Sequence, residues 1–211
     1  MCDGRHDLAS RALPGEMDRT ADAALIRRLQ AGDTAAFDEI HAALNGRLLT
    51  FLLRLSRRRE VAEDLLEETW LRLVTHAKRL RPDTTLAPWL FTVARNLYLS
   101  YLRSRMLEES HAPALMGLWP AGTRQSSPFE ETATNEMERR VEAAIASLPA
   151  TYREVLLLVG VEGFRPAEAA QICGISPEAL RQRLSRARAL AMERLESSSE
   201  TTVAMLREVT T

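Results

Sequence analysis

The sequence predicts an all-α protein made of two small helical domains joined by a flexible linker. Ala, Leu, Arg and Glu dominate the 211 residues, and these residue types form helices readily. Apolar residues recur every three or four positions, whereas runs that alternate Val, Ile or Thr with polar residues are absent. A segment rich in Pro and Gly, residues 107–134, interrupts this periodicity and separates the two predicted domains.

The totals exclude several classes of protein. Hydrophobic residues make up 45% of the chain and charged residues 27%, as in ordinary soluble globular proteins. No run approaches about eighteen consecutive apolar residues, and the first twenty residues lack the apolar core of a secretory signal. We therefore expect a cytoplasmic protein without membrane insertion. The two cysteines, Cys2 and Cys173, do not indicate a disulfide framework.

The first predicted domain, residues 21–106, contains four helices after a flexible tail at residues 1–20. Caps, glycines and prolines place the boundaries of these helices. The first helix ends near Gly32, and Asp33 caps the second, which runs to about Ser56. The third helix covers residues 60–80. A loop follows over residues 81–87, and Pro88 takes the first position of the fourth helix.

The second predicted domain, residues 135–197, is also helical, and the linker before it is expected to be extended and acidic. Residues 198–211 are either a frayed coil or a short extra helix. The expected boundaries are a helix that stops before Pro149, a second ended by Gly163, a third over residues 166–173, a restart at Ser176 and Pro177, and a last helix to about Glu196.

The spacing of Ala170, Gly174 and Leu180 indicates a helix-turn-helix, which needs a small residue at the helix crossing, a glycine in the turn and an apolar wedge. Ile175 and Leu184 complete the wedge. Successive residues of a helix point about 100° apart, so if Leu180 faces the core, Leu184, Ala187 and Ala191 face it as well. The outward face then carries side chains able to contact bases or phosphates, namely Glu178, Arg181, Gln182, Ser185 and Arg186. A solvated arginine face is the alternative interpretation.

Residues 60–68 carry five acidic residues and no basic one. On a helix, Glu63 and Glu67 share one face, as do Asp64 and Glu68. The helix macrodipole would explain part of this clustering, and a basic partner surface would explain it better. Carboxylate-bridged metal sites in helical bundles also use a His three residues after a Glu. That pattern is absent here, so no metal site is predicted.

The fourth helix combines aromatic and cationic side chains, a pairing that suits single-stranded DNA because bases stack on rings while arginines follow phosphates. The alternative is that the rings belong to the core. We favour the core for Trp89 and Phe91, and nucleic acid for Arg95, Asn96 and the preceding loop.

Taken together, four stretches resemble the extracytoplasmic-function (ECF) sigma factors of the sigma-70 family. They cover residues 24–105 and 138–195 in the family's order. The stretches are LIRRLQAGDTAAFDEIH, VAEDLLEETWLRL, LAPWLFTVARNLYLSYLRSR and LPATYREVLLLVGVEGFRPAEAAQICGISPEALRQRLSRAR. The resemblance implies a sigma-2-like four-helix domain, a sigma-4-like helix-turn-helix domain, and an alternative sigma factor that directs promoter-specific initiation without catalysis or a cofactor.

The resemblance also implies partners, which are the β′ clamp helices and β flap of core RNA polymerase, promoter DNA and an anti-sigma factor. The implied polymerase-binding residues are Glu63, Asp64, Leu65, Leu66, Glu67 and Glu68. Those implied for the −10 element are Arg81, Asp83, Thr84, Thr85, Trp89, Arg95 and Asn96. Those implied for the −35 element are Glu178, Arg181, Gln182, Ser185, Arg186 and Arg188.

The formal net charge of −1 fits this interpretation if carboxylates face the polymerase and arginines face DNA. Two other interpretations remain open from the residues alone. One is a stand-alone helix-turn-helix regulator, which predicts a dimer and a palindromic site. The other is a sigma-like mimic that sequesters an anti-sigma factor. No catalytic grouping indicates an enzyme.

Overall fold

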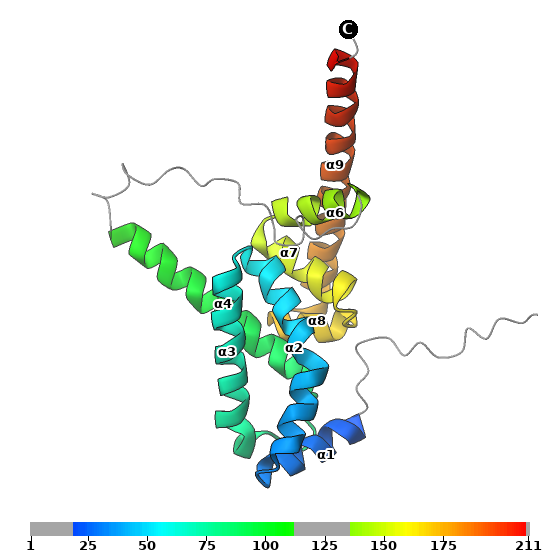
Figure 1. Cartoon of the computed structure of the whole chain (residues 1–211). Coiled ribbons are helices and arrows are strands. Elements are labelled where there is room, and N and C mark those ends of the chain that lie inside the picture. Colours follow the sequence, from blue (N-terminus) through cyan, green and yellow to red (C-terminus); the bar gives the residue numbers. More distant parts are fainter. Residues whose placement is uncertain (1–18, 112–135, 210–211) are drawn as a thin grey trace, which may run out of the picture.

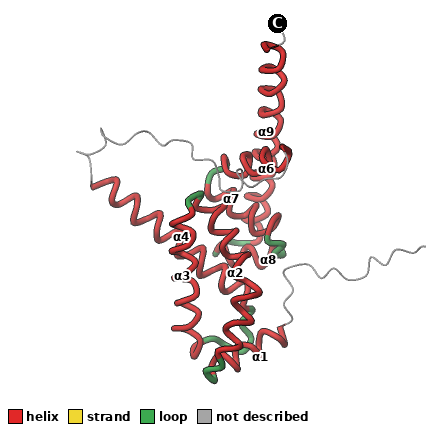
Figure 2. The backbone as a smooth tube through the Cα atoms, viewed as in Figure 1, coloured by secondary structure: helices red, strands yellow, loops and turns green. Residues whose placement is uncertain are grey.

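The computed structural model describes residues 19–111 and 136–209, and every regular element within these ranges is helical (Figures 1 and 2). The all-α prediction is confirmed. Most of the expected N-terminal tail and linker falls outside the described residues. The elements are α1 (Arg19–Gln30), α2 (Thr34–Ser56), α3 (Arg59–His76), η1 (Ala77–Arg79), α4 (Leu86–His111), α6 (Glu136–Ser147), α7 (Ala150–Leu156), η2 (Leu157–Val161), α8 (Pro166–Cys173) and α9 (Pro177–Val209).

The junction between α1 and α2 follows the local chemistry that the sequence predicted. Gly32 adopts a φ of +85°, a conformation that is strained for residues with a Cβ. The Asp33 carboxylate accepts a hydrogen bond from the Ala35 N–H at 2.9 Å and so caps α2. A hydrogen bond from the Arg28 guanidinium, at 2.7 Å, holds the pKa of Asp33 below its usual range. These contacts connect the end of α1 to the start of α2.

The start of α4 differs from the prediction. The helix begins at Leu86, so Pro88 is its third residue rather than its first, and the preceding loop is shorter than expected. Proline is tolerated in this turn because the first N–H groups of a helix have no intrahelical partner. The Leu86 N–H instead donates to the Asp22 carboxylate at 3.0 Å. At its other end α4 continues to His111, beyond the predicted domain end at residue 106.

The second domain contains the predicted helices with two differences. The helix expected over residues 150–163 changes to π-helical geometry in η2, where the Glu162 N–H reaches the Leu157 carbonyl at 2.9 Å. Gly163, with a φ of +73°, then ends it as predicted. The last helix does not stop near Glu196, because α9 runs without interruption to Val209. Residues 203–209, where a short extra helix was one alternative, are helical as part of α9, and residues 210–211 lie outside the described residues.

The two domains pack against each other, which the sequence did not predict. Helix α2 contacts α7 and η2, and α4 contacts α8 (Figure 1). Phe91 of α4 stacks edge-on against Phe164 of the second domain with 4.9 Å between ring centroids, and both rings are buried. The described helices thus share one continuous hydrophobic core. None of the helices in the described ranges is long and apolar enough to cross a membrane.

Candidate protein and nucleic-acid interfaces

The helix-turn-helix is built as the spacing predicted. Ala170 and Leu180 are buried at the crossing of α8 and α9, and Gly174 turns the chain with a φ of +63°. The Ser176 side chain accepts from the Ala179 N–H at 3.1 Å and caps α9 ahead of Pro177. Because the wedge and the cap fix the first turn of α9, the next turns of this helix present a defined face.

The outward face of α9 carries all six predicted residues in exposed positions, and these are Glu178, Arg181, Gln182, Ser185, Arg186 and Arg188. Leu184 and Ala187 lie inward, as the helical phase requires, whereas Ala191 is only half-buried. A hollow of about 420 Å³ beside this face is lined by Gln182, Arg183 and Arg186 of α9 and by Thr151 and Tyr152 of α7. Amide and guanidinium donors thus lie on one exposed face of a helix, and such a face can enter the major groove of DNA.

Helix α3 presents a second charged face. Glu63, Asp64 and Glu67 are exposed, and Glu68 is half-buried. Within the helix, Arg59 pairs with Glu63 at 3.2 Å and Arg72 pairs with Glu68 at 2.7 Å. Two of the carboxylates therefore have an arginine neighbour on the same helix. The expected arrangement, with carboxylates on one surface and arginines on another, is only partly present on α3.

The apolar part of this face differs from the sequence assignment. Leu65 and Leu66 are buried in the core of the first domain, with 9% and 8% of their surface exposed, so they support α3 from within. The exposed apolar side chains are Leu71 and Val74, at 55% and 56%, which follow Glu67 at helical spacing. The sequence reasoning missed them, although continuing the helical phase from Glu67 would have placed them outward.

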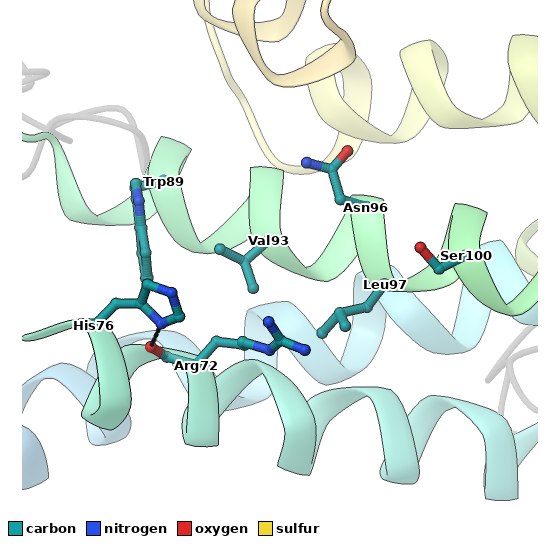
Figure 3. A pocket seen from close by; sticks show the side chains of 7 residues that line it. All are labelled: Arg72, His76, Trp89, Val93, Asn96, Leu97 and Ser100. Carbon is teal, nitrogen blue, oxygen red and sulfur yellow. Dashed lines mark hydrogen bonds between the residues drawn. The ribbon is translucent and has the colours of Figure 1, made fainter.

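A groove of about 340 Å³ runs between α3 and α4 (Figure 3). It is lined by Arg72, His76, Trp89, Val93, Asn96, Leu97 and Ser100. Trp89 is half-buried against the core and forms one end of the groove beside His76, and Asn96 is exposed on α4. Phe91, by contrast, is fully buried, so the core assignment is confirmed for Phe91 and only in part for Trp89.

The loop before α4 projects at the same end of the first domain as α1 (Figure 1). Arg81 and Asp83 are exposed and pair with each other through two hydrogen bonds of 3.0 Å. Thr84 and Thr85 are half-buried, and the Thr84 N–H bonds to the Arg81 carbonyl at 3.0 Å. The predicted loop residues therefore form one compact turn.

Arg95 does not lie on the groove with Asn96. Its guanidinium donates to the Glu154 carboxylate of α7, in the interface between the domains. The groove side of α4 carries Trp89, Val93, Asn96, Leu97 and Ser100. Arg95 points about 100° away from Asn96 around the helix and falls outside this stripe. In this structure Arg95 is thus occupied by a carboxylate of the second domain rather than open to nucleic acid.

Two further arginine–glutamate pairs cross the same interface. Arg54 of α2 pairs with Glu142 of α6, and Arg47 of α2 pairs with Glu162 at 3.1 Å. The Arg47 guanidinium also lies 5.6 Å and 5.7 Å from the Phe91 and Phe164 ring centroids. Burial raises the pKa of Glu162 above its usual range, and Arg47 opposes this shift.

Arg153 joins the domains through backbone contacts. Its guanidinium donates to the Leu55 carbonyl at the end of α2, at 2.9 Å, and to the Ala146 and Leu148 carbonyls at 2.8 Å each. Only 8% of Arg153 is exposed, and burial lowers the pKa of its guanidinium. The second domain thereby supplies a hydrogen-bond donor to the C-terminal end of a helix in the first.

Neither a metal centre nor a reactive thiol emerges from the described residues. No group of three His, Cys, Asp or Glu side chains gathers there in a metal-binding arrangement. Cys173 is 3% exposed on α8, and burial raises the pKa of its thiol to about 12. A thiol in this state is inert at neutral pH.

Comparison with known proteins matches both helical domains in order. The family model for sigma-70 region 2 matches residues 41–107, and that for sigma-70, region 4 matches residues 138–190. The ECF RNA polymerase sigma factor EcfG of Rhodopseudomonas palustris is 38% identical over 151 residues, which cover 72% of this chain and 80% of the relative. The RNA polymerase sigma factor CarQ of Myxococcus xanthus is 31% identical, over 76% and 90% of the two chains.

A solved structure shares the arrangement of helices. It is the sigma factor RpoE from Bartonella quintana, in complex with the anti-sigma factor NepR, with a TM-score of 0.63 and 27% identity. The match covers 76% of this chain and 96% of that one.

Proposed function

The chain belongs to the ECF sigma factors of the sigma-70 family, and from this premise we propose a role for each of its exposed faces in promoter-specific initiation. One face binds core RNA polymerase, and the others bind promoter DNA. As an alternative sigma factor, the chain directs transcription initiation. The observation that carries the assignment of faces is their different charge, since exposed carboxylates predominate on the first half of α3 and exposed arginines with Gln182 predominate on α9. A match to both sigma regions opposes a stand-alone regulator.

The face of α3 docks on the β′ clamp helices of core RNA polymerase. Glu63, Asp64, Glu67 and Glu68 provide charge for a basic partner, and Leu65 and Leu66 hold the helix from the core side. Charge complementarity of this kind speeds encounter and selects the partner.

The loop at residues 81–85 and the adjoining groove read the −10 element as an unpaired strand. Trp89 offers a half-buried ring for stacking, and Asn96 offers both a donor and an acceptor. Arg95 joins this surface only after its contact with Glu154 is released.

The face of α9 reads the −35 element in the major groove. Gln182 suits an adenine edge, whereas Arg181 and Arg186 suit a guanine edge or a phosphate. Arg188 is also exposed, two residues further along α9, where a phosphate contact fits better than a base.

The remaining partners follow from the same assignment. The sigma-4-like domain contacts the β flap, and an anti-sigma factor controls the chain in the cytoplasm. A relative of similar fold that forms a complex with an anti-sigma factor supports that control. The chain contributes no catalytic residue of its own to initiation.

The test replaces Glu63, Asp64, Glu67 and Glu68 together by alanine and measures core polymerase affinity by pull-down and initiation by in vitro transcription. Affinity is expected to fall while the circular dichroism stays helical, because these side chains lie outside the core. A control removes the same charge elsewhere through alanine at the exposed Asp38, Glu136, Glu193 and Glu196. Equal losses in both variants would contradict the assignment of α3.

A further inference from the structure

The loop between η1 and α4 is fastened at both ends by polar side chains of α1. At its start, the Gln30 side-chain amide donates to the Leu80 carbonyl at 2.8 Å and to the Ala77 carbonyl at 3.3 Å. At its end, the Asp22 carboxylate accepts from the Leu86 N–H at 3.0 Å. These contacts join residues that lie 47 to 64 positions apart in the sequence.

The two fastening residues share one face of α1. Asp22, Ile26 and Gln30 are spaced by four, and Asp22 and Ile26 are fully buried. Ile26 packs into the core between the two polar groups, so this face of α1 packs against the other helices of the first domain. The Asp22 carboxyl lies at the N-terminus of α4, where the backbone N–H groups have no intrahelical partner.

The tip of the loop has few contacts of its own. Arg81, Pro82 and Asp83 are exposed, and the described contacts of the tip are the Arg81–Asp83 pair and the bond from the Thr84 N–H to the Arg81 carbonyl. All of these contacts lie within the turn and do not orient it relative to the domain. The orientation of the tip therefore depends on where Leu80 and Leu86 are held.

We propose that Asp22 and Gln30 are positioning residues for promoter selectivity, since they set the conformation in which the loop at residues 81–85 meets the −10 element. This inference rests on the proposed function of that loop. When one of these hydrogen bonds is lost, that end of the loop is held mainly by the buried Leu80 or Leu86 side chain, and the tip populates more conformations. Only a fraction of these fits the DNA, so the apparent affinity falls by that fraction. The loss falls on discrimination among −10 sequences, because base contacts need closer placement than phosphate contacts do.

The experiment uses holoenzyme assembled from core polymerase and full-length chain, on a promoter that the holoenzyme selects from genomic DNA. Two template series carry single-base changes in the −10 or the −35 element. Asp22→Ala removes the acceptor, and Asp22→Asn keeps an oxygen in its place. Gln30→Glu keeps the shape of the side chain and replaces the donor by an oxygen that two carbonyls repel.

Asp22→Ala and Gln30→Glu are expected to reduce the preference for the selected −10 sequence by about tenfold, in line with the loss of one buried hydrogen bond. Core polymerase affinity and −35 discrimination stay at the level of the unsubstituted chain, and Asp22→Asn retains most of the −10 preference. Gln30 is only half-buried, so its variant remains informative if Asp22→Ala fails to fold.

A parallel loss on all templates, or unchanged −10 discrimination in folded variants, would overturn the inference. Asp83→Ala and Thr84→Ala in the loop distinguish this outcome from failure of the proposed function. If these loop variants change −10 discrimination and the α1 variants do not, only the positioning role is wrong. If the loop variants leave it unchanged, the loop assignment itself fails.

Discussion

Arg153 shows how one side chain can serve both domains. Three backbone carbonyls from two domains converge on its guanidinium, and 8% of the residue is exposed. A guanidinium has five N–H donors in a rigid fork, which makes it suitable for this task, whereas a lysine ammonium would reach fewer carbonyls at once.

Replacing Arg153 by alanine is expected to lower the free energy of unfolding by about 2–4 kcal/mol, because charged hydrogen bonds are lost and buried carbonyls lose their partner. Urea denaturation followed by circular dichroism measures the change. The exposed Arg139→Ala, in α6, serves as control and should stay within about 0.5 kcal/mol of the unsubstituted chain. An Arg153→Ala variant as stable as this control would show that water replaces the guanidinium without cost.

At the scale of the elements, two glycines provide opposite tests of backbone conformation. Gly174 turns between α8 and α9 with a φ of +63°, and Gly46 is an exposed residue inside α2. A Cβ added at either position would meet no atom within 4 Å, so contacts do not complicate the comparison.

Gly174→Ala is therefore expected to destabilise the fold by about 1–2 kcal/mol, the cost of a left-handed conformation for an L-residue. Gly46→Ala is expected to stabilise it by about 0.5–1 kcal/mol, because alanine favours the helix and restricts the unfolded chain. Both values come from urea unfolding of the full chain. Changes of the same sign would indicate that something other than backbone conformation decides the outcome.

Helix α3 gives a second test at this scale, since Leu71 and Val74 extend its acidic face with exposed apolar surface. Substituting both by serine should weaken core polymerase binding by about tenfold, because apolar area that docking would bury is lost. Stability should change little, and Met137→Ser at a similarly exposed position is the control. Undiminished polymerase affinity would place the docking surface further toward the start of α3.

The sequence predicted the elements well where local chemistry decides them. Asp33, Gly163 and Ser176 stand at helix boundaries as expected, since caps and left-handed turns depend on a few neighbouring residues. The start of α4 was misplaced because Asp22, distant in sequence, satisfies the Leu86 N–H. The pairing of Arg95 with Glu154 also escaped prediction, since it depends on how the domains pack.

At the scale of the whole molecule, the proposed function has a geometric consequence, because the packed arrangement is too small to contact both promoter elements at once. The −10 and −35 elements lie about 25 base pairs apart, which is roughly 85 Å of duplex. A compact chain of this length has a radius of gyration of about 17 Å. The proposed function therefore requires the domains to separate, which releases the Arg47, Arg54 and Arg95 pairs.

Energy transfer between dyes on cysteines introduced at the exposed Ala43 and Glu193 measures this separation. Cys2→Ser removes one competing thiol, and the burial and raised pKa of Cys173 protect the other. The efficiency of energy transfer should be high in the free chain, where the domains are packed together, and should fall when core polymerase binds. Transfer that stays high in holoenzyme active in transcription would contradict domain separation.

A charge reversal tests the interface itself. Arg54→Glu should lower transfer in the free chain, because two carboxylates then face each other at Glu142. Adding Glu142→Arg should restore it, as expected for residues that interact directly.

One consequence concerns the corner between α2 and α3. The last turn of α2 borrows a donor from Arg153 of the other domain, and Arg59 opens the next helix four residues after Leu55. In the separated chain that the proposed function requires, water replaces the Arg153 guanidinium at the Leu55 carbonyl, just before α3 begins. Without this hydrogen bond, α3 could change its angle to α2 and so adapt to the polymerase surface on which it is proposed to dock.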